Sequence, residues 1–553
     1  MVFLQPFVCI IKQMQNLELV YKNKKNDDDL TSNCFLTILL FLSEKEQRLL
    51  RQTLLSIDSQ TCQQWELIII VPDACFLATY KLDSILDKSA VKHYRIIAST
   101  LPPHKIVQQV EGKYITFIAS GDLLHKDFIC SFFQQQRSNA SLRFFYTDHE
   151  LLTVSSQQPI ANFKPDWNPD YLDSYNYLSR AVIFYRQDLV DLAGLTMESK
   201  LGNKQDYFHW LVLRVTQHCH AEEIYHCATI LFYLNEIGEK QSGESSLTPL
   251  ADFFLVADTL YCPVPPKRKR LISKQTESPL VSIIIPSKNQ ATLLRQCINS
   301  LLDKTTYPFF EILIIDNQSD EPTALAYLEA LSGKKNIRLL HYPHPFNYSA
   351  INNIAVQQAK GSIIALINND IEVISPEWLS EMVAQACRAE IGCVGAKLYY
   401  PDGTIQHGGV ILGIKGTASH AHKYFPKDHS GYCNRLSVVH NVSAVTAACL
   451  VMRKELFEEV NGFDEVNLKV AYNDVDLCLK VLALGYRNLW TPYAELIHYE
   501  SKSRGKKRSW WQRRKLRKEA RFLQKKWGKL LLNDPCYNPN LTLDCEDFSP
   551  KKE

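Results

Sequence analysis

Short apolar runs recur along the chain, separated by stretches in which apolar residues return at helical spacing. The runs at 36–41, 65–70, 281–286 and 310–315 are continuous and rich in Ile, Leu and Val. Such runs are typical of parallel strands that are buried on both faces of a sheet. From Ala291 to Leu302 the apolar spacing is that of a helix. The alternation predicts an α/β fold with mainly parallel sheets and ligand sites at the carboxyl ends of the strands.

These runs form an internal repeat. Residues 36–41 resemble 281–286, and residues 65–70 resemble 310–315 at the same offset. Further matches in the same order join 112–118 to 361–367 and 205–206 to 473–474. Ordered matches over such long segments predict two tandem copies of one domain. The predicted parts are an N-terminal extension (1–30), a first domain (31–250), a Pro-rich basic linker (251–278), a second domain (279–505) and a basic amphipathic helical C-terminal tail (506–553).

Composition narrows the class of protein. Apolar residues make up 46% of the 553 residues and charged residues 22%, with a net charge of +3, so we expect globular domains and no nucleic-acid partner. The cysteines are scattered and form no C-x-x-C pair, which favours buried thiols in a reducing compartment. The N-terminus lacks the basic start of a signal peptide, and no apolar run approaches 18 residues. We expect a cytoplasmic protein, with peripheral contact at the inner face of the cell membrane as the alternative.

Motifs of other nucleotide-binding and hydrolytic enzymes are missing. No G-x-G-x-x-G, G-x-x-x-x-G-K-[ST] or G-x-S-x-G motif occurs, which argues against a dehydrogenase, a P-loop enzyme and an α/β-hydrolase. Polar residues instead follow each apolar run of the second domain. These groups are 286–289, 316–319, 368–370, 473–476 and 498–504. Because parallel strands expose their ligand crevice at their carboxyl ends, we expect these groups to share one site.

The ordered set resembles the family 2 glycosyltransferases with the GT-A fold, most of all bacterial rhamnosyltransferases and O-antigen-type two-domain transferases. The resemblance is close over about 280–505 and looser over about 35–235. The stretches that carry it are VSIIIPSKN (281–289), EILIIDNQSD (311–320), FNYSAINN (346–353), LINNDIEV (366–373), VGAKLYYPDGTIQHGGV (394–410), AYNDVDLCLK (471–480) and ELIHYESKSRG (495–505).

The resemblance implies a site for a nucleotide-sugar donor, UDP- or dTDP-linked. Asp316 would lie in the base pocket, where a carboxylate accepts the imide N–H of uracil or thymine. The alternative is that Asp316 caps the following helix. The other donor-binding residues that the resemblance implies are Pro286, Ser287, Asn289, Asn368, Asn369, Ser503 and Arg504.

The resemblance also implies a divalent cation, Mg²⁺ or Mn²⁺, held by Asp370 and His498. Such an ion binds through one or two carboxylates together with substrate phosphates. The first Asp of the family's D-x-D motif is Asn368 here, which weakens a direct contact at that position. The alternatives are that Asp370 is a turn residue and that His498 is a structural histidine.

Asp474 is the candidate general base. A sugar hydroxyl is a poor nucleophile at neutral pH, and a positioned carboxylate can take its proton as the new bond forms. Direct attack with one base would invert the anomeric centre. The family usually has Glu-Asp where this chain has Asn473-Asp474, a departure that concerns acceptor positioning and not the base itself. The alternative makes Asp474 and Asp476 helix-start residues without chemistry.

The first domain has lost most of these groups. Phe41 and Val71 stand where the second domain has Pro286 and Asp316, and Gly121, or Asp122 after a slip of one position, stands for Asp370. We therefore expect a degenerate domain that serves structure or acceptor binding. The rival hypothesis is a second active site, supported by three residues. These are Asp148, Lys164 and Asp206.

The tail is strongly basic. From Lys502 to Lys529 it has 14 Lys or Arg and one acid, Glu519, with apolar residues at helical spacing. One interpretation is attachment through 506–532 to an anionic membrane or a lipid diphosphate. The other is a solvated basic face whose apolar stripe packs on the second domain.

Together these features predict an inverting, metal-dependent glycosyltransferase. The resemblance implies that it moves a sugar, with rhamnose as one option, to a glycan or lipid-linked glycan acceptor in cell-surface polysaccharide synthesis. The alternatives are a non-catalytic glycan-binding scaffold and a bifunctional transferase with both domains active.

Overall fold

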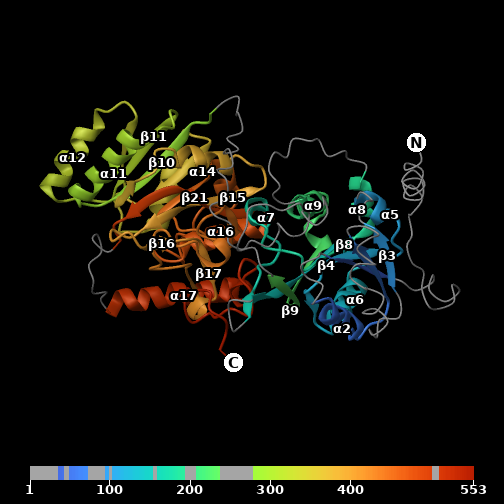
Figure 1. The fold of residues 1–553 in the computed structure, drawn as a ribbon. Coiled ribbons are helices and arrows are strands. Elements are labelled where there is room, and N and C mark those ends of the chain that lie inside the picture. The colour runs from blue at the N-terminus through green and yellow to red at the C-terminus, as the bar shows by residue number, and fades with distance from the viewer. Residues whose placement is uncertain are drawn as a thin grey trace, which may run out of the picture. The chain divides into compact units, whose positions relative to one another are not determined.

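The computed structural model describes residues 35–42, 49–71, 94–98, 103–153, 159–193, 207–236, 278–500 and 510–552. Two units contain them, a first unit within 1–167 and 176–263 and a second unit within 168–175 and 264–553. Each unit is built on one mixed sheet with helices against it (Figure 1). This confirms the predicted pair of α/β domains. The N-terminal extension and nearly all of the linker lie outside the described residues, and the domain boundaries stay predictions.

The sheet of the second unit begins with four parallel strands. Its order is β12-β11-β10-β13-β20-β15-β21-β14, and β20 runs antiparallel to both β13 and β15. These strands are β12 (Ile337–His341), β11 (Phe310–Asp316), β10 (Val281–Ser287), β13 (Ile363–Ile367), β20 (Cys449–Arg453), β15 (Ile391–Tyr399), β21 (Arg487–His498) and β14 (Ile371–Val373). At its margins lie β16 (Ile405–His407) on β15 and β19 (His440–Val442) on β21, while β17 (Val410–Leu412) and β18 (Ala418–His420) form a separate pair.

Helices cover both faces of this sheet, which explains the continuous apolar runs. Ile283 and Ile284 are both fully buried, but successive strand side chains point to opposite faces and so enter different cores. One core includes α11 (Ala291–Lys304), α12 (Pro322–Ser332) and α14 (Trp378–Ala386). The other includes α13 (Tyr348–Gln358), α15 (Lys454–Glu459), α16 (Asn473–Ala483) and α17 (Trp510–Leu532).

The sheet of the first unit repeats this order position by position. It reads β3-β2-β1-β4-β8-β6-β9-β5, again with the first four strands parallel. These are β3 (Tyr94–Ala98), β2 (Trp65–Val71), β1 (Leu36–Phe41), β4 (Tyr114–Ala119), β8 (Val182–Tyr185), β6 (Phe144–Thr153), β9 (Ile224–Glu236) and β5 (Leu123–Leu124), with β7 (Ile160–Asn162) on β6. The helices are α2 (Leu50–Asp58), α5 (Pro103–Gln108), α6 (Phe128–Ser138), α8 (Arg186–Ala193) and α9 (Tyr207–Thr216). The shared strand order supports the duplication that the sequence repeat predicts.

A short helix from the middle of the first repeat folds into the second unit. This helix, α7 (Pro169–Ser174), contains Asp170, which is 6% exposed. The carboxylate of Asp170 pairs with Arg388 at 2.6 Å and with Arg487 at 3.2 Å. It also accepts the side-chain amide of Asn441 at 2.6 Å. Three side chains of the second unit thus hold one carboxylate of α7.

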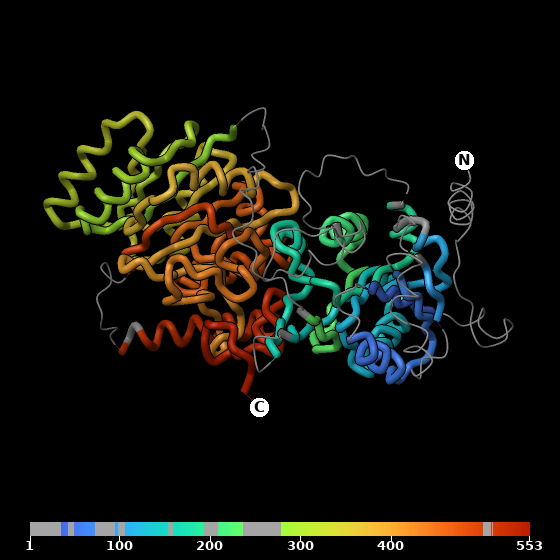
Figure 2. The backbone as a smooth tube through the Cα atoms, viewed as in Figure 1, coloured from blue at the N-terminus to red at the C-terminus, as the bar shows by residue number. Residues whose placement is uncertain are grey.

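The basic tail packs along the second unit, as its red trace in Figure 2 shows. Leu523 of α17 is fully buried, and the carboxylate of Glu519 accepts the backbone N–H of Ala471 at 2.7 Å. Beyond the helix, Glu546 accepts the hydroxyl of Ser419 at 2.7 Å. The apolar stripe of the tail therefore packs on the second domain. Among the described residues, no helix has both the length and the apolar character needed to cross a membrane.

Candidate functional site

The carboxyl ends of β10 and β11 bring the first predicted donor-binding residues together. Ser287 and Asp316 are neighbours in the parallel register of these strands. The carboxylate of Asp316, 5% exposed, accepts the N–H of Ser319 at 3.2 Å. Because α12 begins only at Pro322, Asp316 stabilises a turn and does not cap that helix. Pro286 is half-buried beside them.

Asn289 fixes the loop after β10 to the loop after β11. Its backbone has a left-handed φ of 54°, and its side-chain oxygen accepts the N–H groups of Asp320 at 2.9 Å and Glu321 at 3.1 Å. The two loops that the sequence assigns to base binding are thus joined by hydrogen bonds. Base binding by Pro286, Asn289 and Asp316 stays a prediction.

The turn after β13 connects this donor side to the rest of the site. Asn369 donates its side-chain amide to the hydroxyl of Ser287 at 3.2 Å. Asn368 accepts the hydroxyl of Tyr348 at 3.4 Å. The turn ends at Asp370, directly before β14, so residues 368–370 stand between the strand ends and the last strand of the sheet.

Strand pairing places His498 against this turn. Strands β14 and β21 are antiparallel with Ile371 opposite His498, and the N–H of Tyr499 donates to the carbonyl of Asp370 at 2.9 Å. As a result, Nε2 of His498 lies 3.2 Å from Oδ1 of Asp370 and 3.3 Å from the amide nitrogen of Asn368. Asp370 is 5% exposed and His498 9%.

The spacing of Asp370 and His498 fits a shared divalent cation. Two ligand atoms in neighbouring positions around an ion at about 2.1 Å lie about 3.0 Å apart. Over the described ranges no group of three or more His, Cys, Asp or Glu suits a metal ion. Asp370 and His498 would therefore supply two ligands and leave the other positions to phosphate oxygens and water.

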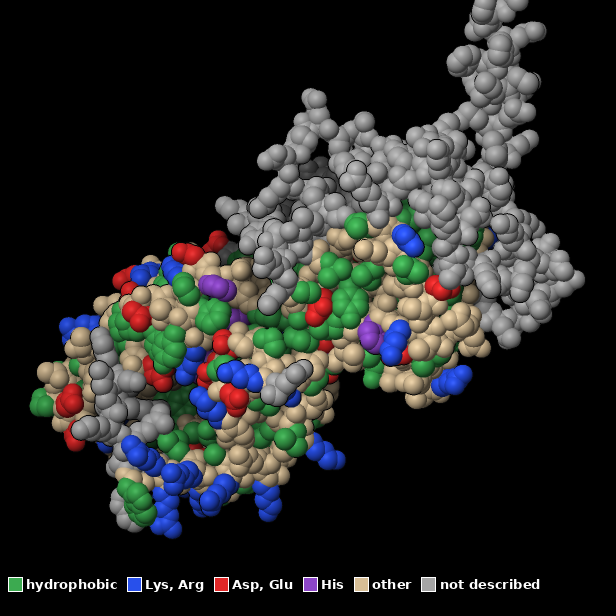
Figure 3. All heavy atoms as spheres, turned by 60° about the horizontal axis from the view of Figure 1, so that its bottom comes forward, with side chains coloured by type: hydrophobic (Ala, Val, Ile, Leu, Met, Phe, Trp, Pro, Cys, Tyr) green, Lys and Arg blue, Asp and Glu red, His purple; other side chains and the backbone are tan. Residues whose placement is uncertain are grey.

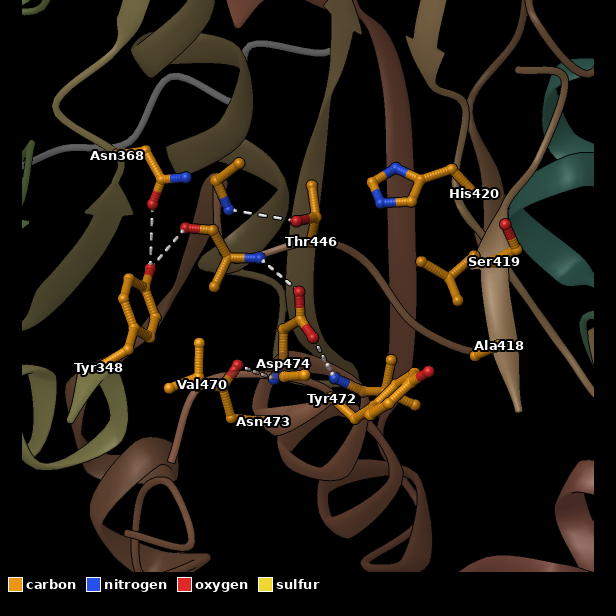
Figure 4. A pocket seen from close by; sticks show the side chains of 15 residues that line it. Tyr348, Asn368, Ala418, Ser419, His420, Thr446, Val470, Tyr472, Asn473 and Asp474 are labelled. Atoms are coloured by element: carbon orange, nitrogen blue, oxygen red, sulfur yellow. Dashed lines mark hydrogen bonds between the residues drawn. The ribbon is translucent and has the colours of Figure 1, made fainter. Parts of the chain in front are cut away.

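Asp474 lies in a pocket of about 250 Å³ that also contains Asn368. In Figure 4, Tyr348 and Asn368 lie on one side of it, Ala418, Ser419 and His420 lie on the other, and Asp474 lies between them. The lining residues are Tyr348, Asn368, Val410, Ala418, Ser419, His420, Thr446, Ala447, Ala448, Val470, Ala471, Tyr472, Asn473, Asp474 and Val475. The turn that ends in Asp370 thus shares a pocket with the candidate base.

The carboxylate of Asp474 is held in place by backbone groups. It accepts the N–H of Ala447 at 3.2 Å and the N–H of Val475 at 2.9 Å. Burial raises the pKa of Asp474 above its ordinary value, while the hydrogen bonds from Ala447 and Val475 oppose the rise. A half-buried carboxylate with a raised pKa suits a general base.

The neighbours of Asp474 have structural partners. Asn473 is 4% exposed and donates its side-chain amide to the hydroxyl of Ser349 at 3.1 Å. Asp476 is fully buried and accepts the indole N–H of Trp527 at 2.7 Å. Both Asp474 and Asp476 lie in the first turn of α16, but only Asp474 lines the pocket.

Ser503 and Arg504 lie outside the described residues. Sequence reasoning missed Tyr348, Thr446 and Gln406. Tyr348 and Gln406 occur within stretches that carry the family resemblance, in FNYSAINN and PDGTIQHGG. Thr446 lies in no such stretch, and only the folded chain brings it to the pocket.

Comparison with known protein families identifies the family of the domain in the second unit. Residues 282–460 match the family model described as Glycosyl transferase family 2. The second unit carries a family 2 glycosyltransferase domain. The match includes the strand ends from Pro286 to Asp370, but it ends before Asp474 and His498. The roles of those two residues in the glycosyltransferase domain are therefore proposals.

Two curated relatives extend over most of the chain. An uncharacterized protein of Sinorhizobium fredii is 40% identical over 460 residues, which are 80% of this chain and 50% of the relative. The O-antigen biosynthesis protein RfbC of Myxococcus xanthus is 32% identical over 530 residues, which are 91% of this chain and 40% of the relative. The chain spans half or less of the length of these relatives.

Among solved structures, a mannosyltransferase of Pyrobaculum calidifontis in complex with GDP-Man and Mn²⁺ is 17% identical. It matches with a TM-score of 0.32 over 41% of this chain and 59% of its own. Similarity at this level carries no argument about the site of the glycosyltransferase domain.

In the first unit an arginine pairs with the aspartate that corresponds to Asp370. Asp122 directly precedes β5, as Asp370 directly precedes β14, so Asp122 rather than Gly121 is the counterpart. The guanidinium of Arg180 contacts the two carboxylate oxygens of Asp122 at 2.9 and 3.1 Å. Both side chains are at most 3% exposed. The carboxylate already has a buried cationic partner, which supports the prediction of a degenerate domain.

Two of the three residues that favoured a second active site, Asp148 and Lys164, have partners within the fold of the first unit. Asp148 accepts the backbone N–H of Lys164 at 2.8 Å and contacts Nε2 of His226 at 3.0 Å. The buried ammonium of Lys164 donates to the carbonyl of Leu178 at 2.8 Å. Asp206 lies outside the described residues.

Proposed function

We propose that the second unit transfers a sugar from a nucleotide-diphosphate donor to a glycan acceptor with inversion of the anomeric centre. The proposal rests on one observation: Asp370 and His498 lie 3.2 Å apart, and Asn368 of the same turn shares a pocket with Asp474. The relationship to RfbC supports a task in O-antigen or related cell-surface polysaccharide synthesis. A UDP- or dTDP-linked sugar is the proposed donor, with rhamnose the first sugar to test.

Each residue has a distinct task in this reaction. Asp474 takes the proton of the acceptor hydroxyl while that oxygen attacks the anomeric carbon, and the bond to the diphosphate oxygen breaks. Asp316 and Asn289 orient the base, and Asn369 with Ser287 holds the turn that leads to Asp370. A Mg²⁺ or Mn²⁺ ion held by Asp370 and His498 would neutralise the charge that develops on the leaving diphosphate.

The donor and its metal dependence can be tested together by thermal shift. A panel of nucleotide sugars with Mn²⁺ or Mg²⁺ should raise the melting temperature of the wild-type chain only when metal is present. At about 100 times the Kd a ligand stabilises the native state by about 2.7 kcal/mol. The variant Asp370→Ala should lose this shift, whereas the control Asp303→Ala, which removes an exposed carboxylate on α11, should keep it. If no nucleotide sugar gives a metal-dependent shift, the proposed donor chemistry is wrong.

We further propose that the outward face of α17 contacts an anionic membrane surface. Lys and Arg side chains gather over this part of the second unit in Figure 3. The exposed cations include Arg513, Arg514, Lys515, Arg517, Lys518, Arg521, Lys525 and Lys529. Because Leu523 is buried against the glycosyltransferase domain, attachment would depend on charge rather than on insertion of apolar side chains.

Vesicle binding tests this surface. Each cation near an anionic bilayer contributes about 1 kcal/mol, so changing Lys515, Lys518 and Lys525 to Gln should weaken binding to phosphatidylserine-containing vesicles about a hundredfold. Binding should also weaken with added salt. Transfer to a short soluble acceptor should not change. Equal binding of the wild type and the triple variant, or no binding by the wild type, would remove the membrane from the proposal.

A further inference from the structure

Gln406 is a buried amide that joins the proposed metal ligand His498 to a carboxylate. It lies in β16 and is 1% exposed. Its Oε1 is 2.7 Å from Nδ1 of His498, and its Nε2 is 3.1 Å from Oε2 of Glu500. Neither the predicted site residues nor the family match gives Gln406 a role.

The direction of these hydrogen bonds follows from what each group can do. A carboxylate only accepts, so the amide nitrogen of Gln406 must face Glu500. The amide oxygen then faces His498 and can only accept, so the proton of a neutral imidazole must be on Nδ1. The lone pair of Nε2 is thereby turned toward Asp370, 3.2 Å away.

In the other tautomer, Nε2 of His498 could not bind a cation. With its proton on Nε2, the imidazole would donate to Oδ1 of Asp370, and each group would satisfy the other without a cation. With the proton on Nδ1, Nε2 of His498 and Oδ1 of Asp370 are two acceptors 3.2 Å apart, and a cation between them would bind both; the amide nitrogen of Asn368 lies 3.3 Å from the same Nε2. The protein therefore has to keep the imidazole proton on the far nitrogen.

We propose that Gln406 is a positioning residue that fixes the tautomer of His498 and so keeps Nε2 and Asp370 available for a divalent cation. This inference rests on the proposed metal-dependent function. Hydrogen bonds to the second nitrogen of a ligating histidine are a general way of fixing its orientation, and their loss typically costs 10- to 100-fold in metal affinity. Glu500 acts on His498 indirectly, because its carboxylate sets the orientation of the Gln406 amide.

Mn²⁺ binding in the presence of UDP or dTDP, measured by electron paramagnetic resonance, tests the role without relying on activity. Gln406→Met, which keeps the length of the side chain but removes both polar groups, should bind Mn²⁺ about 10- to 100-fold more weakly. The double variant Gln406→Glu with Glu500→Gln exchanges the amide and the carboxylate but still presents an acceptor to Nδ1. It should recover most of the affinity.

The outcomes separate this inference from the proposed function. If the wild type does not bind Mn²⁺ with either nucleotide, the proposed metal site fails. If the wild type binds and Gln406→Met binds equally well, the metal site stands and the positioning role is overturned. Should Gln406→Met fail to fold, the double variant decides: weak Mn²⁺ binding by a folded double variant, as judged by circular dichroism, also overturns the role.

Discussion

Replacing Asp474 with asparagine is expected to lower kcat by about 10²- to 10⁴-fold, the range that general-base catalysis contributes. Asparagine keeps the shape of the side chain, and its carbonyl oxygen can still accept the N–H of Ala447. The fold and donor binding should therefore persist. Steady-state kinetics with a short glycan acceptor, paired with the donor thermal shift, measures both effects. A kcat within tenfold of wild type would exclude Asp474 as the base.

The pH profile gives an independent signature of the same residue. The base works only when ionised, so activity falls as the pH drops through its pKa. Because burial raises the pKa of Asp474, the acid limb of the profile should lie above the value of about 3.9 that an ordinary aspartate shows. Asp474→Asn should lose this limb in whatever activity remains. A limb that is unchanged in the variant would assign it to another group.

Asp122→Ala is expected to destabilise the first unit by about 3–5 kcal/mol, since removal of one partner of a buried ion pair is strongly destabilising. Arg180 is 3% exposed and would lose both contacts with the carboxylate. The backbone N–H of Ala119, which donates to Asp122 at 2.8 Å, would also lose its partner. Hydrogen exchange of the amides in β4 measures the local free energy of opening.

A double variant separates charge from packing in this pair. Asp122→Ala combined with Arg180→Met removes the guanidinium as well and should recover part of the stability, because an apolar replacement of a buried ion pair is often tolerated. Neither variant should gain Mn²⁺ binding, since β9 has no histidine opposite β5 where β21 has His498 opposite β14. Unchanged exchange in Asp122→Ala would mean that the ion pair does not stabilise the unit.

The sequence predicted the parallel half of each sheet well. The runs at 281–286 and 310–315 became β10 and β11, and the helical spacing from Ala291 became α11, because burial on both faces leaves a clear apolar signal. The antiparallel strand β20 and the long strands β9 and β21 were not predicted from the sequence. Their places depend on pairings between residues far apart in the chain.

The candidate site was predictable where a motif marks a strand end. Asp370 and Asp474 come from such motifs, and the structure brings their segments to one pocket. The Asp122–Arg180 pair and the Gln406–His498 contact join residues 58 and 92 positions apart. No local pattern connects such residues, so only the folded chain shows that one carboxylate has a guanidinium partner while the other faces an imidazole.

The helix α7 has a consequence for where this chain can be divided. Residues 168–175 lie within the first repeat in sequence but belong to the second unit, where Asp170 meets Arg388 and Arg487. A gene fragment that starts at the second repeat would encode every residue of the proposed site and still lack part of its fold. Arg388 and Arg487 would then lose Asp170, their buried anionic partner, and keep the exposed Glu390. The matching strand orders support two copies of one architecture, but residues 168–175 of the first repeat belong to the fold of the second unit, so an expressed second unit should include them.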